Sequence, residues 1–302
     1  MQGNLVVVGS LNMDLIVRAP RLPHGGETLA GHDFATAAGG KGANQAVAAA
    51  RLGAQVAMIG CVGADAYGAR LRTALLVEGI DCTAVSEIEG VPTGIASILV
   101  DDAGQNAIVI VAGGNGALTP AHLDAQAALL AAAQVLVVQL EVPQTTVEAA
   151  MTRGREAGCT VILNPAPASG PLPAHWYGLA DYLIPNESEA AALTGLPVDS
   201  PESALHAAQR LLQVGARRVL ITLGSQGVLY ADAERHAHFA VAPVVAVDST
   251  AAGDTFVGGF AAALAAGQTL ESAIDLGQQA AALAVTRPGA QPSIPYRHEL
   301  PA

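Results

Sequence analysis

The residues best suited to chemistry lie in Asp248–Phe256, which reads Asp-Ser-Thr-Ala-Ala-Gly-Asp-Thr-Phe. The apolar run Val241–Val247 before it predicts a strand, and the run Val257–Ala266 after it predicts a helix. Ala251–Gly253 would then stand at a helix start, whose free backbone N–H groups suit an anion. Asp254 could remove a proton from a nucleophile while these N–H groups hold a phosphoryl group in transfer. A plain helix N-cap favours the same residue types, so this motif alone leaves both interpretations open.

A second candidate motif is Gly39–Gln45, Gly-Gly-Lys-Gly-Ala-Asn-Gln, which opens a predicted helix over Ala43–Leu52. Glycines let the backbone approach a ligand closely, and Lys41 is the only lysine among 14 basic residues. The motif lacks the spacing of a P-loop and the last glycine of a dinucleotide-binding fingerprint. It therefore predicts hydrogen bonds from Lys41 and Asn44 to a ligand rather than a pyrophosphate site.

A third motif, Asn186-Glu-Ser-Glu189, begins another predicted helix. An Asn at the N-cap with a Glu three residues later is typical of a capping box, which is a purely structural arrangement. The same amide and carboxylate could also hold Mg²⁺ through water beside nucleotide phosphates. The two interpretations are compatible, and the sequence favours neither.

The elements that must position these motifs alternate along the chain. Short apolar runs are typical of strands buried on both faces, and segments with helical apolar spacing separate them. The predicted strands are Leu5–Gly9, Thr28–Ala38, Gln55–Gly60, Val135–Leu140, Thr160–Leu163, Tyr182–Ile184 and Val219–Leu223, and the other predicted helices are Ala66–Glu78, Ala121–Ala132, Pro201–Val214 and Ser272–Thr286. Hairpins are predicted over Thr93–Val111 and Gly227–Val241. The pattern predicts one α/β domain over residues 1–302, with a doubly wound, mostly parallel sheet flanked by helices.

Polar residues follow many of these strands. Ligands of an open α/β sheet bind beyond the carboxyl ends of its strands, whereas unrelated caps and loops need not gather there. The sequence therefore predicts a site at this edge of the sheet. The residues expected to meet there are Asn12, Asp14, Glu141, Asn186, Thr222, Gly224, Gly253 and Asp254.

Composition narrows the classes of partner. The chain has 302 residues, of which 51% are hydrophobic, and a net charge of −12, which argues against a basic face that binds nucleic acid. Three scattered cysteines, Cys61, Cys82 and Cys159, indicate reduced thiols and a cytoplasmic location rather than disulfides. The N-terminus has no basic, apolar signal pattern, and the most apolar stretch, Ala127–Val138, is too short to cross a membrane.

These motifs together resemble the ribokinase-like (PfkB) family of carbohydrate kinases over nearly the whole chain. Gly39–Ala46 resembles the first family signature and Asp248–Phe256 the second. Supporting matches are Gly9–Asp14, Gln139–Glu141, Leu163–Pro167, Pro185–Glu189, Ile221–Ser225 and Ala284–Ser293. The resemblance implies a small β lid inserted at about residues 15–38 and 93–111, which would also pair two subunits into a homodimer.

The resemblance also implies roles for individual residues. Asp254 would be the catalytic base, and the backbone of Ala251, Ala252 and Gly253 would form the anion hole for the γ-phosphoryl group of ATP. The sugar would be bound by Asn12, Asp14, Gly40, Lys41, Asn44 and Glu141, and ATP by Asn186, Thr222, Gly224, Gly227 and Gln278, the last standing where ribokinase-like relatives commonly have Asn. Glu189 would hold Mg²⁺ through water, and Asp248, Thr250, Ala284, Arg287, Gly289 and Ser293 would hold a monovalent cation, usually K⁺.

The acceptor is predicted to be an uncharged sugar. Asp14 and Glu141 would repel a phosphate group on it, and the family resemblance implies phosphorylation of D-ribose to ribose 5-phosphate. Deoxyribose, fructose and nucleosides stay open, because one hydroxyl group changes binding by only a few kcal/mol. Two other classes of protein are alternatives. A non-catalytic sugar-binding protein would not need Asp254 together with Gly253, and a nicotinamide-dependent dehydrogenase would need a Gly-x-Gly-x-x-Gly after the first strand, which is absent.

Overall fold

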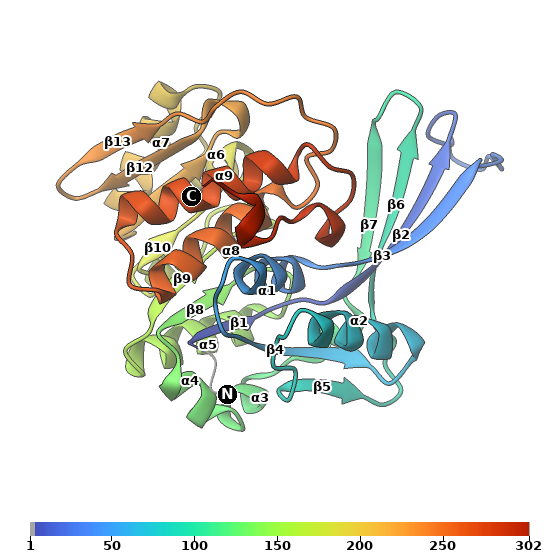
Figure 1. Ribbon diagram of the computed structural model, residues 1–302, viewed down its shortest axis with the longest axis horizontal. Coiled ribbons are helices and arrows are strands. Elements are labelled where there is room, and N and C mark those ends of the chain that lie inside the picture. Colours follow the sequence, from blue (N-terminus) through green and yellow to red (C-terminus); the bar gives the residue numbers. More distant parts are fainter. Residues whose placement is uncertain (1–3, 302) are drawn as a thin grey trace.

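The strands form two sheets in the computed structural model, which describes residues 4–301 (Figure 1). The larger sheet contains β1 (Leu5–Val8), β4 (Val56–Gly63), β5 (Val85–Ile88), β8 (Val135–Val138), β9 (Thr160–Leu163), β10 (Tyr182–Leu183), β11 (Arg218–Thr222), β12 (Val228–Asp232) and β13 (His236–Phe239). Their order is β13-β12-β11-β10-β9-β8-β1-β4-β5. Strands β11 to β5 of this order run parallel, and β12 and β13 add an antiparallel edge.

Helices cover both faces of the large sheet. They are α1 (Lys41–Arg51), α2 (Ala66–Val77), α3 (Pro120–Asp124), α4 (Ala127–Ala132), α5 (Gln144–Glu156), α6 (Glu187–Thr194), α7 (Pro201–Gln213), α8 (Ala252–Ala265) and α9 (Leu270–Ala284). In β1, Leu5 and Val7 pack with α1, α2, α8 and α9, whereas Val6 and Val8 pack with α3 to α7. Alternate residues of β1 thus pack into the cores on opposite faces of the sheet, which explains why the strand is apolar throughout. The predicted doubly wound, mostly parallel sheet is confirmed.

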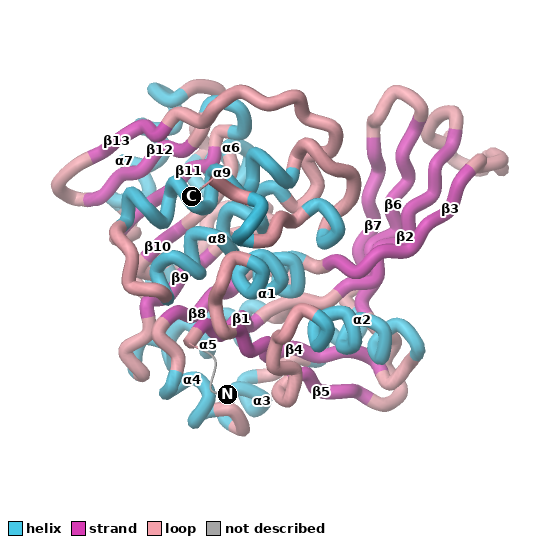
Figure 2. The backbone as a smooth tube through the Cα atoms, viewed as in Figure 1, coloured by secondary structure: helices cyan, strands magenta, loops and turns pink. Residues whose placement is uncertain are grey.

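A smaller sheet stands to one side and forms a β lid (Figure 2). Its strands are β2 (Asn12–Ala19), β3 (Asp33–Gly39), β6 (Gly94–Asp101) and β7 (Asn106–Val111), in the order β3-β2-β6-β7. The hairpin predicted over Thr93–Val111 is confirmed as β6 and β7, which pair antiparallel. Because β2 pairs in parallel with β6 from Asn12 opposite Gly94, the lid begins where the site residues lie.

The strand predicted over Val241–Val247 is wrong. The chain runs from β13 to α8 as an irregular loop, and Val244, Val245 and Val247 are exposed. Pro243 lies in the middle of this apolar run and has no N–H group to donate to a ladder. The N–H groups of Val247 and Asp248 both donate to Val285 O instead, at 2.7 and 3.1 Å. The loop is thereby joined to the end of α9 rather than to the sheet.

Other element boundaries differ by smaller amounts. The helix predicted over Ala121–Ala132 is divided into α3 and α4, and the strand predicted from Thr28 begins only at Asp33. The helix predicted from Ala43 begins at Lys41, so Lys41 lies in its first turn. Cys61, Cys82 and Cys159 are free and buried. None of the helices within residues 4–301 has the length and apolar character needed to cross a membrane.

Candidate active site

Asp254 lies in the first turn of α8 and is buried. The turn into this helix passes through Ala251, whose φ of 59° makes it the one non-glycine residue with a positive φ in the described chain. Left-handed backbone is unfavourable for alanine and is found at functional turns that surrounding structure holds in place. A Cβ atom on Gly253 would meet no other atom within 4 Å, so open space adjoins this backbone.

The carboxylate of Asp254 accepts two hydrogen bonds from amide side chains of α1. Asn44 Nδ2 donates to Oδ2 at 2.9 Å, and Gln45 Nε2 donates to Oδ1 at 3.0 Å. Asn44 Oδ1 is buried and has no hydrogen-bond partner in the described structure. A buried acceptor without a partner is costly unless a ligand donates to it, so Asn44 can receive a hydroxyl group.

A cavity of about 200 Å³ lies against the start of α8. Its wall brings together the first turn of α8 with side chains that follow β9, β10 and β11, and it is mostly polar. The lining residues are Lys41, Asn164, Ala166, Ile184, Asn186, Glu189, Thr222, Ser249, Ala251, Ala252, Gly253, Asp254 and Val257. A helix N-terminus and a lysine on one cavity suit the phosphate groups of a nucleotide.

Among the expected sugar ligands, Asn12, Asp14, Gly40 and Glu141 lie at the base of the lid, while Lys41 also lines the cavity. Glu141 Oε2 accepts from Ser10 Oγ at 2.6 Å, from the backbone N–H of Lys41 at 3.1 Å and from Asn12 Nδ2 at 3.5 Å. Gly40 has a φ of 91°, and a Cβ atom there would meet Asn12 N at 2.7 Å. Only glycine fits this close approach of two backbone segments.

Burial and neighbouring charges shift the pKa values of this cluster. The pKa of Asp14 is raised from 3.8 to about 7, mainly by burial and in addition by the carboxylates of Glu141 and Asp254. Burial lowers the pKa of Lys41, but Asp254, Glu141 and Glu189 outweigh that effect and leave it raised. Lys41 is therefore a firmly charged ammonium group among carboxylates.

Asn186 and Glu189 form the predicted capping box. Asn186 Oδ1 accepts from the backbone N–H of Glu189 at 2.8 Å, and the backbone N–H of Asn186 donates to Glu189 Oε2 at 2.9 Å. Burial raises the pKa of Glu189, while the bond from Asn186 and the charge of Lys41 act against this. Residues 4–301 contain no group of three His, Cys, Asp or Glu that could hold a metal. A buried carboxylate beside a phosphate-sized cavity fits Mg²⁺ that keeps most of its water ligands.

Three of the remaining nucleotide candidates, Thr222, Gly224 and Gly227, lie at the β11–β12 turn, and Gln278 lies on α9. Thr222 pairs with Asn186 in a parallel bridge, and both residues line the cavity. Gly224 and Gly227 have φ values of 51° and 90°, and a Cβ atom on Gly227 would meet Phe239 O at 2.0 Å. Gln278 Nε2 donates to the same carbonyl oxygen at 2.8 Å, so it joins α9 to the end of β13.

The two segments expected to bind a cation, 248–250 and 284–293, contact each other next to the start of α8. Asp248 Oδ1 accepts from the backbone N–H and the hydroxyl of Thr250, at 2.9 and 2.6 Å, and Oδ2 accepts from the N–H of Gly289 at 2.8 Å. Burial raises the pKa of Asp248, but these hydrogen bonds outweigh it and lower the pKa. Segments 248–250 and 284–293 are thus joined, and the oxygen atoms that they offer are of the type that binds K⁺.

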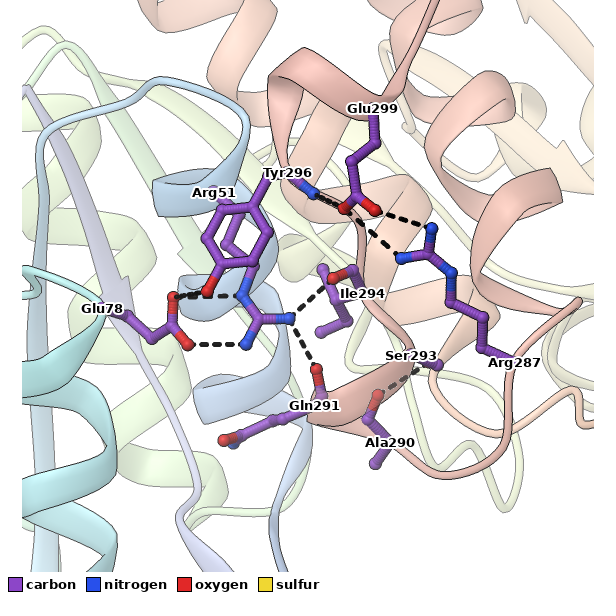
Figure 3. A network of polar contacts seen from close by, with 9 residues as sticks. All are labelled: Arg51, Glu78, Arg287, Ala290, Gln291, Ser293, Ile294, Tyr296 and Glu299. Atoms are coloured by element: carbon purple, nitrogen blue, oxygen red, sulfur yellow. Dashed lines mark hydrogen bonds and ion pairs between the residues drawn. The ribbon is translucent and has the colours of Figure 1, made fainter.

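Arg51, at the end of α1, fastens the second of these segments (Figure 3). Its Nη1 donates to the backbone oxygens of Gln291 and Ile294 at 2.7 and 2.6 Å. Its Nη2 pairs with Glu78 at 2.5 Å, and the guanidinium lies 4.6 Å from the ring centroid of Tyr296. One helix therefore carries Lys41 and Asn44 at its start and holds the turn around Ser293 at its end.

Other buried polar residues bond to the site residues but were not among those predicted. Gln45 lies next to Asn44 in the glycine-rich motif, and Gln139 and Asn164 follow β8 and β9. Ser10 and Asn115 are also buried, and Asn115 donates to the carbonyl of Leu11 and to Asn12 Oδ1. For Gln139 and Asn164, the signal in the sequence was a polar side chain directly after an apolar run.

Comparisons with known proteins show to which family the chain is similar. The family model described as "pfkB family carbohydrate kinase" matches residues 2–297. The ribokinase of Haemophilus influenzae is 43% identical over 299 residues, which cover 99% of this chain and 97% of that protein. The deoxyribokinase of Salmonella typhi is 37% identical over 292 residues, which cover 97% of this chain and 95% of that protein. The structure of Arabidopsis thaliana ribokinase complexed with ribose and ATP has a TM-score of 0.93 and 35% identity, covering 99% and 97% of the two chains.

The raised pKa of Asp14 predicts a stability cost in the ligand-free protein. Between about pH 4 and 7 the folded protein holds a proton on Asp14 that the unfolded chain releases, so stability falls as the pH rises through this window. We expect Asp14→Asn to increase the free energy of unfolding by roughly 1–4 kcal/mol at pH 8 and to leave it unchanged near pH 3. Urea unfolding at both pH values measures this, with the exposed Asp102→Asn as the control. An equal gain at both pH values would contradict the assignment.

Proposed function

Since the chain belongs to the pfkB family of carbohydrate kinases, which confirms the resemblance seen in its motifs, we propose that it phosphorylates D-ribose. The γ-phosphoryl group of ATP would pass to the primary hydroxyl of the sugar, giving ribose 5-phosphate and ADP. The observation that carries this proposal is the place of Asp254. Asp254 Oδ2 accepts a hydrogen bond from Asn44, which is one of the residues expected to bind the sugar, and Asp254 also lines the polar cavity at the start of α8.

The chain's own residues supply most of what phosphoryl transfer requires. That reaction depends on alignment and on neutralising the moving group rather than on covalent chemistry by the protein. Asp254 takes the proton of the sugar hydroxyl, whose oxygen then attacks the γ-phosphorus as the bond to ADP breaks. The N–H groups of Ala251–Gly253 and the charge of Lys41 stabilise the transferring group. Mg²⁺, held beside Glu189 and Asn186, would neutralise the phosphates of ATP.

The residues expected to bind the acceptor indicate an uncharged sugar as the substrate. Asp14 and Glu141 are buried or half-buried carboxyl groups that hydrogen-bond hydroxyls readily and disfavour an acceptor that already carries phosphate. A deoxyribokinase at 37% identity makes deoxyribose the second candidate.

Initial rates with ATP and Mg²⁺ should give the highest kcat/KM for D-ribose among ribose, deoxyribose, fructose, adenosine and fructose 6-phosphate. A higher kcat/KM for deoxyribose would transfer the proposal to that sugar.

The lid also suggests a homodimer. Phe34 and Ile108–Val111 are exposed apolar side chains on β3 and β7, which a second copy of the chain would cover. Sedimentation should give about twice the monomer mass of 30.3 kDa for the wild type, whereas Val109→Asp should shift the protein toward monomer. A monomeric wild type would exclude this assembly.

Removing the base should slow the chemical step. We expect Asp254→Asn to lower kcat by roughly 10²–10⁴-fold, because a general base contributes that much and the amide cannot accept the proton. The variant keeps the size of the side chain, and thermal unfolding in the presence of ribose checks that it folds and binds. Unchanged kcat would show that Asp254 is not the base.

The joined segments 248–250 and 284–293 predict activation by K⁺. The carboxylate of Asp248 and the carbonyl oxygens of Ala284, Arg287 and Gly289 would hold the ion directly behind the anion-binding turn. We expect a higher kcat in K⁺ than in Na⁺, because the smaller ion would draw this turn out of shape. The rates are measured in a potassium salt free of Na⁺ and in a sodium salt free of K⁺. Equal rates in the two salts would contradict this role.

A further inference from the structure

A chain of buried side-chain amides leads from the large sheet to Asp254. Gln139 Nε2 donates to Gln45 Oε1 at 2.6 Å, and Gln45 Nε2 donates both to Asn164 Oδ1 and to Asp254 Oδ1, each at 3.0 Å. Asn164 Nδ2 donates to the backbone oxygen of Ile184 at 2.8 Å. Gln45 and Gln139 have no exposed surface, so neither is placed to touch a substrate.

The direction of every amide in this chain is fixed by its ends. The carbonyl of Ile184 can only accept, so the nitrogen of Asn164 faces it and Oδ1 is left to accept from Gln45. Gln45 must then present its nitrogen to Asn164, and this nitrogen also reaches the carboxylate of Asp254. Its oxygen receives the N–H of Gln139. Both hydrogens of Gln45 are therefore used, and the group cannot rotate without losing three hydrogen bonds.

We propose that Gln45 is a positioning residue that holds Oδ1 of Asp254 against the protein and leaves Oδ2 to take the proton of the sugar. Oδ2 accepts from Asn44 Nδ2, and Asn44 Oδ1 beside it has no partner within residues 4–301. A hydrogen bond donated to a carboxylate stabilises its ionised form, which is the form that a base requires. This inference rests on the proposed role of Asp254.

Three charged side chains interact with Asp254, and Gln45 differs from all of them. They are Lys41 from α1, Asp14 from β2 and Glu189 from α6. Gln45 is neutral at every pH and bonds the carboxylate directly. Its contribution is therefore constant, while those of the acidic neighbours change with pH and with ligand binding.

Two variants of Gln45 test the inference. Gln45→Met keeps the length of the side chain but cannot donate, and Gln45→Glu keeps the shape but places a second carboxyl group against Asp254. The single-turnover rate is measured against pH with saturating ribose and ATP, so that it reports the chemical step. For Gln45→Met we expect a loss of about tenfold at pH 7, a KM for ribose within about twofold of wild type, and an acid limb moved up by about one pH unit. Gln45→Glu should move the limb further.

The control is Thr146→Val on α5, which removes the buried hydrogen bond of 2.7 Å that Thr146 Oγ1 donates to Leu118 O, away from Asp254. It should reduce stability and leave the pH profile in place. An acid limb that stays at the wild-type pH in both Gln45 variants would overturn the inference, even if their rates fall. Unchanged kcat in Asp254→Asn would instead overturn the role of the base and the inference with it. Gln45→Glu provides the test if Gln45→Met fails to fold.

Discussion

The shortage of positive charge around Asp254 constrains the rest of the site. Asp14 and Glu189 are buried near Asp254, and Lys41 is the ammonium group that acts on this cluster. Carboxylates removed from water repel one another strongly, so the fold must supply other donors. It does so with amides, hydroxyls and backbone N–H groups, as the three bonds to Glu141 illustrate. A site built in this way suits a ligand that brings hydroxyl groups, together with phosphate groups whose charge a cation neutralises.

The parallel sheet is what makes this concentration of polar groups possible. Its strands end at one edge, so side chains from distant parts of the sequence meet without long loops. Helix α1 reinforces the arrangement, because its first turn contributes Lys41 and Asn44, while Arg51 at its other end holds the C-terminal segment (Figure 3). Hydrogen bonds between these polar groups explain how a polar site is stable within an apolar core.

Sequence reasoning predicted the layers of the fold and the meeting of the main motifs, because apolar periodicity and strand ends reflect burial directly. It failed at Val241–Val247, where β-branched residues favour a strand but Pro243 and the absence of a neighbouring strand prevent one. It also left the two readings of Asn186 open, and the structure shows the capping box beside the cavity. The role of Gln45 could not be predicted, since its partners follow strands more than 90 residues away.

Strand β2 ties the pocket to the lid. It carries Asn12 and Asp14 at its start, and every residue from Asn12 to Arg18 has a partner on both β3 and β6. Inserting or deleting one residue would turn the following side chains to the opposite face and lose the register on both sides. A change in the length of this segment would therefore disturb the lid and the base of the pocket together.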